Sequence, residues 1–490
     1  MSSDFQLYGE HLRSYLSDES RLTGSFKQIS YPCSTEELIA VLHDLIAAHT
    51  PFTLQGARTG ISGAAVPKNG MVVSTEKSQS ISSIQGNEEE GFYVIADAGA
   101  RLYAVNTAAI AEGLIFAPNP GEETATIGGL FSVGAYGSNS FRYGSVAASV
   151  SSADILLPSG EIITVRRGEN LFKEKGVFLP NGNFLSALVS SDNQTICAFT
   201  PQPGSDLLDV FAGSEGMFGI AIRLKLSLGT APYNPKAVVF FFTNEDVGAA
   251  FGNRIKKTGI PDFVEYFDKN ALSIIDRQKH VLPKLKDLPD FPLDAVCAIY
   301  IELTSLFAEE TEEWLMDRLE DFEASGGRED YTWAAFGQYE ADRFRILRHA
   351  LPEAINIRID EIRRINNDII KTCADITAPN ADTEEFLSYC KTTAASPGIE
   401  HYVFGHLAEN RLHINFVPKD RKESCLAEEA ILKICRFSIR NGGKIFSENG
   451  IGRTKAALFK QLVSEEELAL LQEIKHFFDP DRLFNPECFL

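Results

Sequence analysis

The most regular pattern of apolar positions in the chain lies at residues 220–228. Every second residue there is apolar: Ile220, Ile222, Leu224, Leu226 and Leu228. An apolar period of two predicts a strand with one buried face. Upstream, short apolar stretches alternate with helical patterns and glycine-rich connections. We therefore expect strands near 52–54, 71–74 and 92–96, helices near 36–48 and 102–112, and a hairpin at 153–165.

A second pattern begins after residues 229–236, whose sequence GTAPYNPK is typical of a linker. An unbroken apolar strand is expected directly after it, at 237–242. Further strands are expected at 298–303 and 413–416, and long charged helices at 309–324, 345–372 and 422–441. Strands mixed with helices in this way predict an α+β arrangement. We expect two modules with a boundary near residue 230.

The composition narrows the class of protein. The chain has 490 residues, and 46 Lys and Arg against 67 Asp and Glu give a net charge of −21. Nucleic acids and anionic membranes are therefore poor partners. No apolar run approaches the roughly 20 residues of a transmembrane helix, and the N-terminus has no targeting pattern, so we expect a cytoplasmic protein. The eight cysteines include no C-x-x-C pair, which argues against an iron–sulfur or zinc-ribbon site.

The first candidate for chemistry is the glycine-rich segment 55–65, QGARTGISGAA, which directly follows the expected strand at 52–54. Glycines let successive backbone N–H groups turn toward an anion such as a pyrophosphate where basic side chains are few. The segment is not a Rossmann fingerprint, because G-x-G-x-x-G is absent and a strand follows instead of a helix. An ordinary loop with flexible glycines is the alternative that this segment leaves open.

The second candidate, at 118–137, reads as a helix of small residues opened by Thr126. Gly128, Gly129 and Gly134 would together cost on the order of 3 kcal/mol relative to alanine in a helix. Either a flat ring system approaches this backbone closely, or the helix packs tightly on a sheet. A third glycine-rich segment, at 211–220, leads into the alternating strand. Three such segments suggest one extended nucleotide cofactor that touches the protein from several sides.

A different candidate lies nearer the C-terminus, at His406, His413 and Glu448. His413 lies in the alternating segment 412–416 and points away from its apolar face. His406 precedes a short polar turn, so a hairpin would bring both imidazoles together. Two imidazoles and a carboxylate suit Zn²⁺ or a similar divalent ion with one open coordination position. Hydrogen-bonded histidines beside a β-turn are the alternative.

Together these segments resemble the vanillyl-alcohol oxidase superfamily, in the branch of D-lactate dehydrogenases, D-2-hydroxyglutarate dehydrogenase and the GlcD-type chain of glycolate oxidase. The matching stretches keep the family's order: QGARTGISGAAVP, PNPGEETATIGGLFSVGAYG, FRYGSVAASV, LPSGEI, GSEGMFGI, GHLAENRLHINF, GGKIFSENGIGRTK and DPDRLFNP. The resemblance implies an α+β fold with a PCMH-type FAD-binding domain of two subdomains and an α+β substrate domain. The implied divisions are a lead-in at 1–28, the FAD domain at 29–230, the substrate domain at 231–440, and a segment at 441–490 that returns to the FAD domain and completes the active site.

The resemblance also implies roles for individual residues. The pyrophosphate of FAD would be held by Gly56, Ala57, Arg58, Thr59, Gly60, Ile61, Ser62 and Gly63. The flavin side would be lined by Pro118, Gly121, Thr126, Gly128, Gly129, Gly137, Tyr143 and Gly144, with Ile220 near the adenine. No histidine lies in these segments, so we expect non-covalent FAD. His406, His413 and Glu448 would be metal ligands, and Arg348 would clamp a substrate carboxylate; an ordinary helix-face arginine is the alternative.

The chain departs from the family at several positions. Arg58 stands where the family has glycine, and it would either add a positive charge at the pyrophosphate or distort the loop. Asn449 replaces the family histidine assigned to accept the substrate's hydroxyl proton. Asparagine cannot act as a base, so Asn449 would orient the substrate, with His401 or a metal-bound water as the proton acceptor. Cys373 and Ala374 stand where the relatives have a substrate-binding lysine, which leaves the substrate open.

The implied function is oxidation of a D-2-hydroxy acid of the D-lactate, glycolate or D-2-hydroxyglutarate class to the 2-oxo acid, by hydride transfer to FAD. A divalent metal ion such as Zn²⁺ would assist. Two alternatives stay open: a metal-independent FAD alcohol or sugar-acid oxidase, and a subunit that only binds FAD or relays electrons in a larger complex. The electron acceptor is unidentified and could be a quinone, an electron-transferring flavoprotein or a partner subunit. A homodimer is one arrangement that the sequence leaves open.

Overall fold

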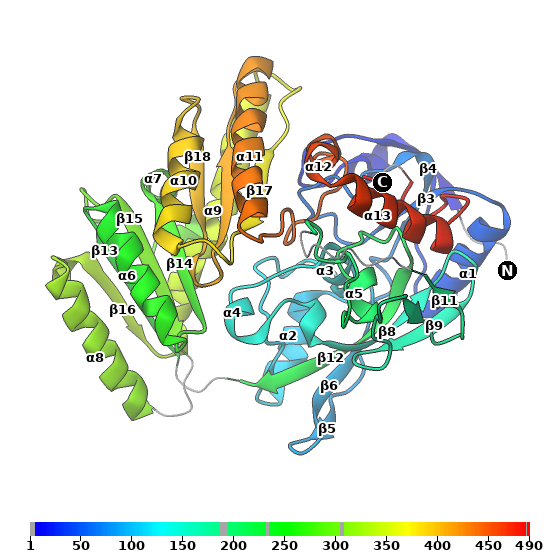
Figure 1. The fold of residues 1–490 in the computed structure, drawn as a ribbon, viewed down its shortest axis with the longest axis horizontal. Helices are drawn as coiled ribbons and strands as arrows, with labels where there is room; N and C mark the ends of the chain where they lie inside the picture. The colour runs from blue at the N-terminus through cyan, green and yellow to red at the C-terminus, as the bar shows by residue number, and fades with distance from the viewer. Residues whose placement is uncertain (1–4, 187–194, 232–234, 304–307, 487) are drawn as a thin grey trace. The chain divides into compact units, whose positions relative to one another are not determined.

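The computed structural model describes residues 5–186, 195–231, 235–303, 308–486 and 488–490 (Figure 1). These residues form two compact units. The first unit comprises Met1–Gly137, Tyr143–Ala231 and Phe446–Leu490, and the second comprises Ser138–Arg142 and Pro232–Ile445. The chain therefore leaves the first unit, builds the second, and then returns to the first.

A four-stranded sheet of order β1-β2-β4-β3 opens the first unit. β4 runs parallel to β2 and β3, and β1 is antiparallel to β2. Helix α1 (Thr35–Ala47) starts at Ser34, whose side chain accepts a hydrogen bond from the Glu37 N–H. Its apolar face packs into the core that contains Phe52 of β3. The strands are β1 (Phe5–Leu7), β2 (Ser25–Ser30), β3 (Phe52–Gln55) and β4 (Lys68–Ser74).

A second, antiparallel sheet of the first unit has the order β5-β6-β12-β8-β9, and a short strand, β7, also pairs with β12. β12 contains the predicted alternation: Leu224 and Leu226 are fully buried, whereas Arg223 and Lys225 are only partly buried. The strand prediction is confirmed. The elements are β5 (Gln85–Asn87), β6 (Gly91–Asp97), β7 (Leu114–Ile115), β8 (Val150–Leu156), β9 (Ile162–Arg166) and β12 (Ile220–Thr230).

Residues 446–490 complete the first unit. Phe484 forms a parallel bridge to Phe52 of β3. The Phe52 N–H donates to the Leu483 carbonyl, and the Asn485 N–H donates to the Phe52 carbonyl, each at 3.0 Å. The predicted return of the C-terminal segment is therefore present. The other elements are α2 (Leu102–Ala111), α3 (Ile127–Val133), α4 (Ser140–Tyr143), β10 (Val177–Phe178), β11 (Phe184–Leu185), α5 (Leu207–Phe211), α12 (Ala456–Leu462) and α13 (Glu465–Phe478).

The second unit is built on a seven-stranded antiparallel sheet of order β16-β13-β15-β14-β18-β19-β17. Four of its strands are buried along their whole length: β13, β14, β15 and β17. A strand buried on both faces needs helices on both sides of the sheet. The strands are β13 (Lys236–Phe242), β14 (Phe263–Asp268), β15 (Cys297–Leu303), β16 (Thr332–Phe336), β17 (Thr372–Thr377), β18 (His401–His406) and β19 (Arg411–Phe416).

The helices of the second unit are α6 (Glu245–Thr258), α7 (Lys269–Gln278), α8 (Ala308–Ala324), α9 (Gln338–Arg363), α10 (Thr383–Ala395) and α11 (Arg421–Arg440). The predicted bounds of one helix, 345–372, are wrong, because Thr372 already belongs to β17. The polar residues after α9 compete with its backbone hydrogen bonds. Asn366, for example, accepts a hydrogen bond from the Asp368 N–H through its own side chain.

Across the part of the chain that the structure describes, no helix combines the length and apolar character that a membrane span requires.

Candidate functional site

A hollow of about 880 Å³, open to solvent, lies in the first unit beside the glycine-rich segment that follows β3. This size falls within the range of cofactor and small-molecule sites. Small residues dominate its wall, and the N-terminal segment, the turn before β12 and the C-terminal tail all contribute to it. The lining residues are Asp18, Leu54, Gly56, Ala57, Arg58, Thr59, Gly60, Ser62, Ala64, Ala65, Thr75, Ala98, Ala125, Thr126, Gly128, Gly129, Leu130, Ser132, Val133, Glu215, Gly216, Ala221 and Asn485.

The glycines of α3 are small for different reasons. A Cβ on Gly128 would lie 2.7 Å from the Ala98 Cβ, so close packing against the end of β6 explains this residue. Gly134 ends the helix with a φ of +69°, which glycine adopts without strain. Gly129 differs, because an added Cβ would meet only the capping oxygen of Thr126, at 2.9 Å. The packing alternative thus accounts for Gly128, and Gly129 presents its bare backbone to the hollow.

Arg58 has a left-handed backbone, with a φ of +61°, which costs a non-glycine residue roughly 1–2 kcal/mol. Its guanidinium lies over the Tyr15 ring, 4.2 Å from the centroid. Its Nη1 lies 3.6 Å from Glu76 Oε2, while the Tyr15 hydroxyl donates to Glu76 Oε1 at 2.6 Å. Nη1 is buried without a hydrogen-bond partner. Among the described lining residues Arg58 is the one with a basic side chain, and it retains a donor for an anion.

Two buried acids line the same hollow. Burial raises the pKa of Asp18 to about 6, against the opposing hydrogen bonds from Ser20. Burial also raises the pKa of Glu215 to about 7. Glu215 accepts hydrogen bonds from the Gly452 N–H at 2.9 Å and from Cys488 Sγ at 2.9 Å. The Glu215 side chain therefore ties the turn before β12 to the C-terminal segment of the first unit.

The predicted cofactor residues divide into two groups. One group lines the hollow: Gly56, Ala57, Arg58, Thr59, Gly60, Ser62, Thr126, Gly128 and Gly129. The other group lies outside its wall: Ile61, Gly63, Pro118, Gly121, Gly137, Tyr143, Gly144 and Ile220. Of these, Gly137 packs so tightly that an added Cβ would overlap the backbone of Pro118 and Asn119. Sequence reasoning did not single out Asp18 or Asn485. The roles of both groups toward FAD stay predictions.

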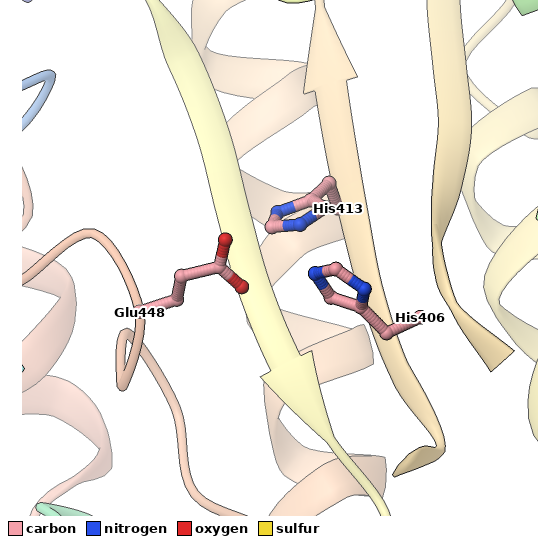
Figure 2. Close-up of side chains that lie close together, drawn as sticks. All are labelled: His406, His413 and Glu448. Carbon is pink, nitrogen blue, oxygen red and sulfur yellow. The ribbon is translucent and has the colours of Figure 1, made fainter. Parts of the chain in front are cut away.

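The second unit contains the predicted histidine hairpin. β18 and β19 pair through the short turn Leu407–Glu409, and Asn410 takes the left-handed conformation at its end. The rings of His406 and His413 lie 5.8 Å apart. Glu448 follows the last residue of this unit, Ile445, by three positions along the chain. Ligand atoms of the two histidines and Glu448 all lie within 4.8 Å of one another (Figure 2).

Arg348 of α9 and Glu265 of β14 adjoin this hairpin. Glu265 stands opposite His406 in the strand register. Glu265 Oε2 lies 3.1 Å from Arg348 Nε and 3.2 Å from His406 Nδ1. Burial alone would raise the pKa of Glu265, but the charges of Arg348 and His406 outweigh it and lower the pKa to about 2. Arg348 is 14% exposed, and its Nη1 is buried without a hydrogen-bond partner.

Two further residues considered for proton transfer have clear positions. His401 is at the opposite end of β18 from His406, and its Nδ1 is 2.8 Å from the Ile399 carbonyl. Five residues of strand span about 16 Å and reverse the side-chain direction, so the suggestion of His401 as the base is wrong. Asn449 directly follows Glu448 and is partly buried. Its role stays a prediction.

The side chains present fit both groups that the sequence implied. The hollow offers bare backbone at Gly129 and unpaired donors at Arg58 Nη1 and Ser62 Oγ, which suit the phosphates and the flat ring of a dinucleotide. Two imidazoles with one carboxylate are a ligand set of catalytic zinc sites that keep a position open.

Comparison with known proteins identifies the family. Residues 231–488, more than half of the chain, match the profile of the C-terminal domain of FAD linked oxidases. The chain belongs to the FAD-linked oxidases. Residues 26–166 of this FAD-linked oxidase also match an FAD binding domain.

Two similar proteins are a D-lactate dehydrogenase of Anaerostipes hadrus and the glycolate oxidase subunit GlcD of Bacillus subtilis. The first is 27% identical over 463 residues, 92% of this chain and 87% of the relative. The second is 24% identical over 459 residues, 93% of this chain and 87% of the relative. Among solved structures, an alkyldihydroxyacetonephosphate synthase matches with a TM-score of 0.67 at 14% identity, covering 99% of this oxidase and 82% of that chain. At that identity the likeness shows a shared fold.

Proposed function

We propose that this FAD-linked oxidase converts a D-2-hydroxy acid of the D-lactate, glycolate or D-2-hydroxyglutarate class to the corresponding 2-oxo acid. The family membership supports an oxidoreductase, and the similar D-lactate dehydrogenase and glycolate oxidase subunit support the substrate class. The reaction removes a hydride from the α-carbon and a proton from the hydroxyl group. FAD, when bound non-covalently, supplies the hydride acceptor. The hydroxy acid and an electron acceptor, either a quinone, an electron-transferring flavoprotein or a partner subunit, are the partners of the reaction.

FAD would be held in the hollow of the first unit. Gly56, Gly60 and Gly129 let the backbone approach the cofactor, and Arg58 Nη1 and Ser62 Oγ offer donors to its phosphates. Among the described lining residues one cation faces two acids whose pKa values burial raises. A raised pKa favours the neutral carboxyl, so Asp18 and Glu215 oppose a diphosphate less than two full charges would.

The single observation that carries the substrate class is the unpaired Nη1 of Arg348. Glu265 already holds the Nε side of this guanidinium, so the arginine stays charged and oriented with one N–H edge available. A substrate carboxylate is the natural acceptor for that edge, because charge-assisted hydrogen bonds of this kind are the strong ones. Each would contribute about 1.5–3 kcal/mol.

The substrate hydroxyl group would lie near His406, His413 and Glu448. A divalent ion held by these side chains supplies Lewis-acid assistance by lowering the pKa of the hydroxyl group. Asn449 would orient the substrate through hydrogen bonds and cannot accept its proton. With His401 at the other end of its strand, we assign the hydroxyl proton to water in the site.

Anaerobic bleaching of the flavin tests the proposal. Purified protein with FAD bound is mixed with D-lactate, glycolate or D-2-hydroxyglutarate in the absence of oxygen, and loss of the oxidised flavin absorbance is followed. At least one acid should bleach the flavin. In Arg348→Lys, KM for that acid should rise about tenfold or more, since a bidentate donor becomes a point charge. Arg345→Lys is the matched control, because Arg345 is spent on Glu302. No bleaching with any 2-hydroxy acid would refute the proposed activity.

One observation favours a second candidate function. Asn449 lacks the basic nitrogen of the family histidine, and a similar protein is named as a subunit of glycolate oxidase. A flavoprotein subunit that binds FAD and relays electrons would need no base. This candidate predicts a yellow protein that no hydroxy acid bleaches but that dithionite reduces fully.

A further inference from the structure

Glu265 is a buried acid in the middle of the second unit's sheet, and it lies outside every motif that the sequence singled out. It is 1% exposed. In the register of β14 and β18 it stands opposite His406, and in the register of β14 and β15 it stands opposite Tyr300. Paired residues of neighbouring strands point to the same face. The carboxylate therefore lies on the face of the sheet that bears the histidine hairpin.

One oxygen of this carboxylate serves two partners. Oε2 lies 3.1 Å from Arg348 Nε and 3.2 Å from His406 Nδ1. A third contact closes the triangle, since Arg348 Nη2 lies 3.3 Å from His406 Nε2. Displacement of the carboxylate would therefore release the arginine and the imidazole together.

A carboxylate beside Nδ1 decides which ring nitrogen carries the proton. It favours hydrogen on Nδ1, which leaves Nε2 as the nitrogen with a free electron pair. This is the arrangement in which an outer carboxylate orients a histidine ligand and raises its basicity. The same carboxylate fixes the plane of the Arg348 guanidinium through Nε and so sets the direction of its unpaired Nη1.

The neighbouring strand offers a natural comparison. Glu302 of β15 is 2% exposed and binds Arg345, one helical turn before Arg348, at 2.7 and 3.1 Å. Both acids are therefore buried in the same sheet and paired with an arginine of α9. The difference is that the carboxylate of Glu302 accepts hydrogen bonds from Arg345 and Tyr300, neither of them a histidine of the hairpin.

We propose that Glu265 is a positioning residue that orients His406 for a divalent ion and Arg348 for the substrate carboxylate at the same time. The inference rests on the proposed function for the identity of those two ligands. It assigns to Glu265 the coupling of two recognition events, of the metal ion and of the carboxylate, through a single side chain.

Zinc binding by the metal-free full-length protein tests this role without any turnover. Zn²⁺ alone is titrated by equilibrium dialysis into wild type, Glu265→Gln and the matched control Glu302→Gln. We expect Glu265→Gln to bind Zn²⁺ about 10–100-fold more weakly, the usual effect of losing an outer-shell partner. Glu302→Gln should bind within about twofold of wild type. Equal losses in both variants, or none in Glu265→Gln, would overturn the proposal.

Folding of the variants is checked by intrinsic fluorescence, because both tryptophans, Trp314 and Trp333, are buried in the second unit. If Glu265→Gln does not fold, Glu265→Asp keeps the charge and withdraws the carboxylate from His406, and it should still weaken Zn²⁺ binding about tenfold. Unchanged binding in that variant would also refute the role.

A second readout concerns the arginine. With a hydroxy acid that bleaches wild type, Glu265→Gln should raise KM at saturating Zn²⁺, whereas Glu302→Gln should not. The two levels of hypothesis fail differently. Absence of bleaching in wild type refutes the proposed activity. Zn²⁺ binding that is absent in wild type, or unaffected by Glu265→Gln, refutes the positioning role.

Discussion

Replacement of Asp268 by asparagine should change how the stability of the second unit depends on pH. Asp268 is the N-cap of α7, where its side chain accepts from the Ala271 N–H at 2.7 Å, and it also accepts from the Val403 N–H of β18 at 2.9 Å. Burial raises its pKa from 3.8 to about 7, against these hydrogen bonds and the charge of Lys391. The carboxyl group therefore holds its proton more tightly in the folded protein than in the unfolded chain.

The sign and size follow from this difference. The stabilisation by the bound proton is complete below pH 4 and is lost as the pH rises through 7. At 1.36 kcal/mol per pKa unit, the free energy of unfolding of the wild type should fall by roughly 2–3 kcal/mol between pH 5 and pH 8 from this group alone. An asparagine side chain has no proton to lose over this range, so the stability difference between wild type and Asp268→Asn should shift by that amount in favour of the variant.

Urea unfolding followed by tryptophan fluorescence measures this difference. Both tryptophans belong to the second unit, so their signal reports on the unit that contains Asp268. The two proteins are compared at pH 5, 6, 7 and 8 at constant ionic strength, which cancels the contributions of other titrating groups. A stability difference that stays constant over this range, or that moves in favour of the wild type as the pH rises, would refute the reasoning.

Three other predictions concern the cofactor hollow and the metal ligands. Arg58→Gly removes a left-handed arginine, so the apoprotein should stay within about 1 kcal/mol of wild type, whereas FAD affinity, measured by quenching of flavin fluorescence, should fall about tenfold and riboflavin affinity should not change. Gly128→Ala places a Cβ 2.7 Å from the Ala98 Cβ and should destabilise the first unit by about 1–3 kcal/mol in calorimetry; an unchanged melting temperature would contradict the packing. Chelation with EDTA should abolish bleaching by hydroxy acids and leave the flavin bound, and Zn²⁺ should restore it; full activity after chelation would favour the metal-independent alternative.

The histidine hairpin could be predicted because its signals are local. The alternation at 412–416 fixed the direction of His413, and the short polar turn brought His406 beside it. Glu265 could not be found in this way. Its strand, β14, is buried on both faces, so its sequence FVEYFD lacks an alternating pattern, and a charged residue inside a buried strand was the one signal available.

Other limits of the sequence lie in contacts between distant segments. Asp18 reaches the hollow from a segment upstream of the matched FAD binding domain, and Glu215 meets Gly452, whose N–H group it binds. Such contacts leave no periodic trace in the chain. The predicted helix at 345–372 failed for a local reason, because the polar turn after Arg363 continues the helical pattern of the sequence without continuing the helix.

The insertion of the second unit between two parts of the first has a consequence for biosynthesis. Residues 232–445 emerge from the ribosome before residues 446–490, so the seven-stranded sheet can form while the first unit still lacks its last segment. Asn485 lines the hollow and Phe484 borders β3. A nascent chain therefore cannot present a finished nucleotide pocket, and capture of the vitamin-derived prosthetic group is expected to be among the last steps of its maturation.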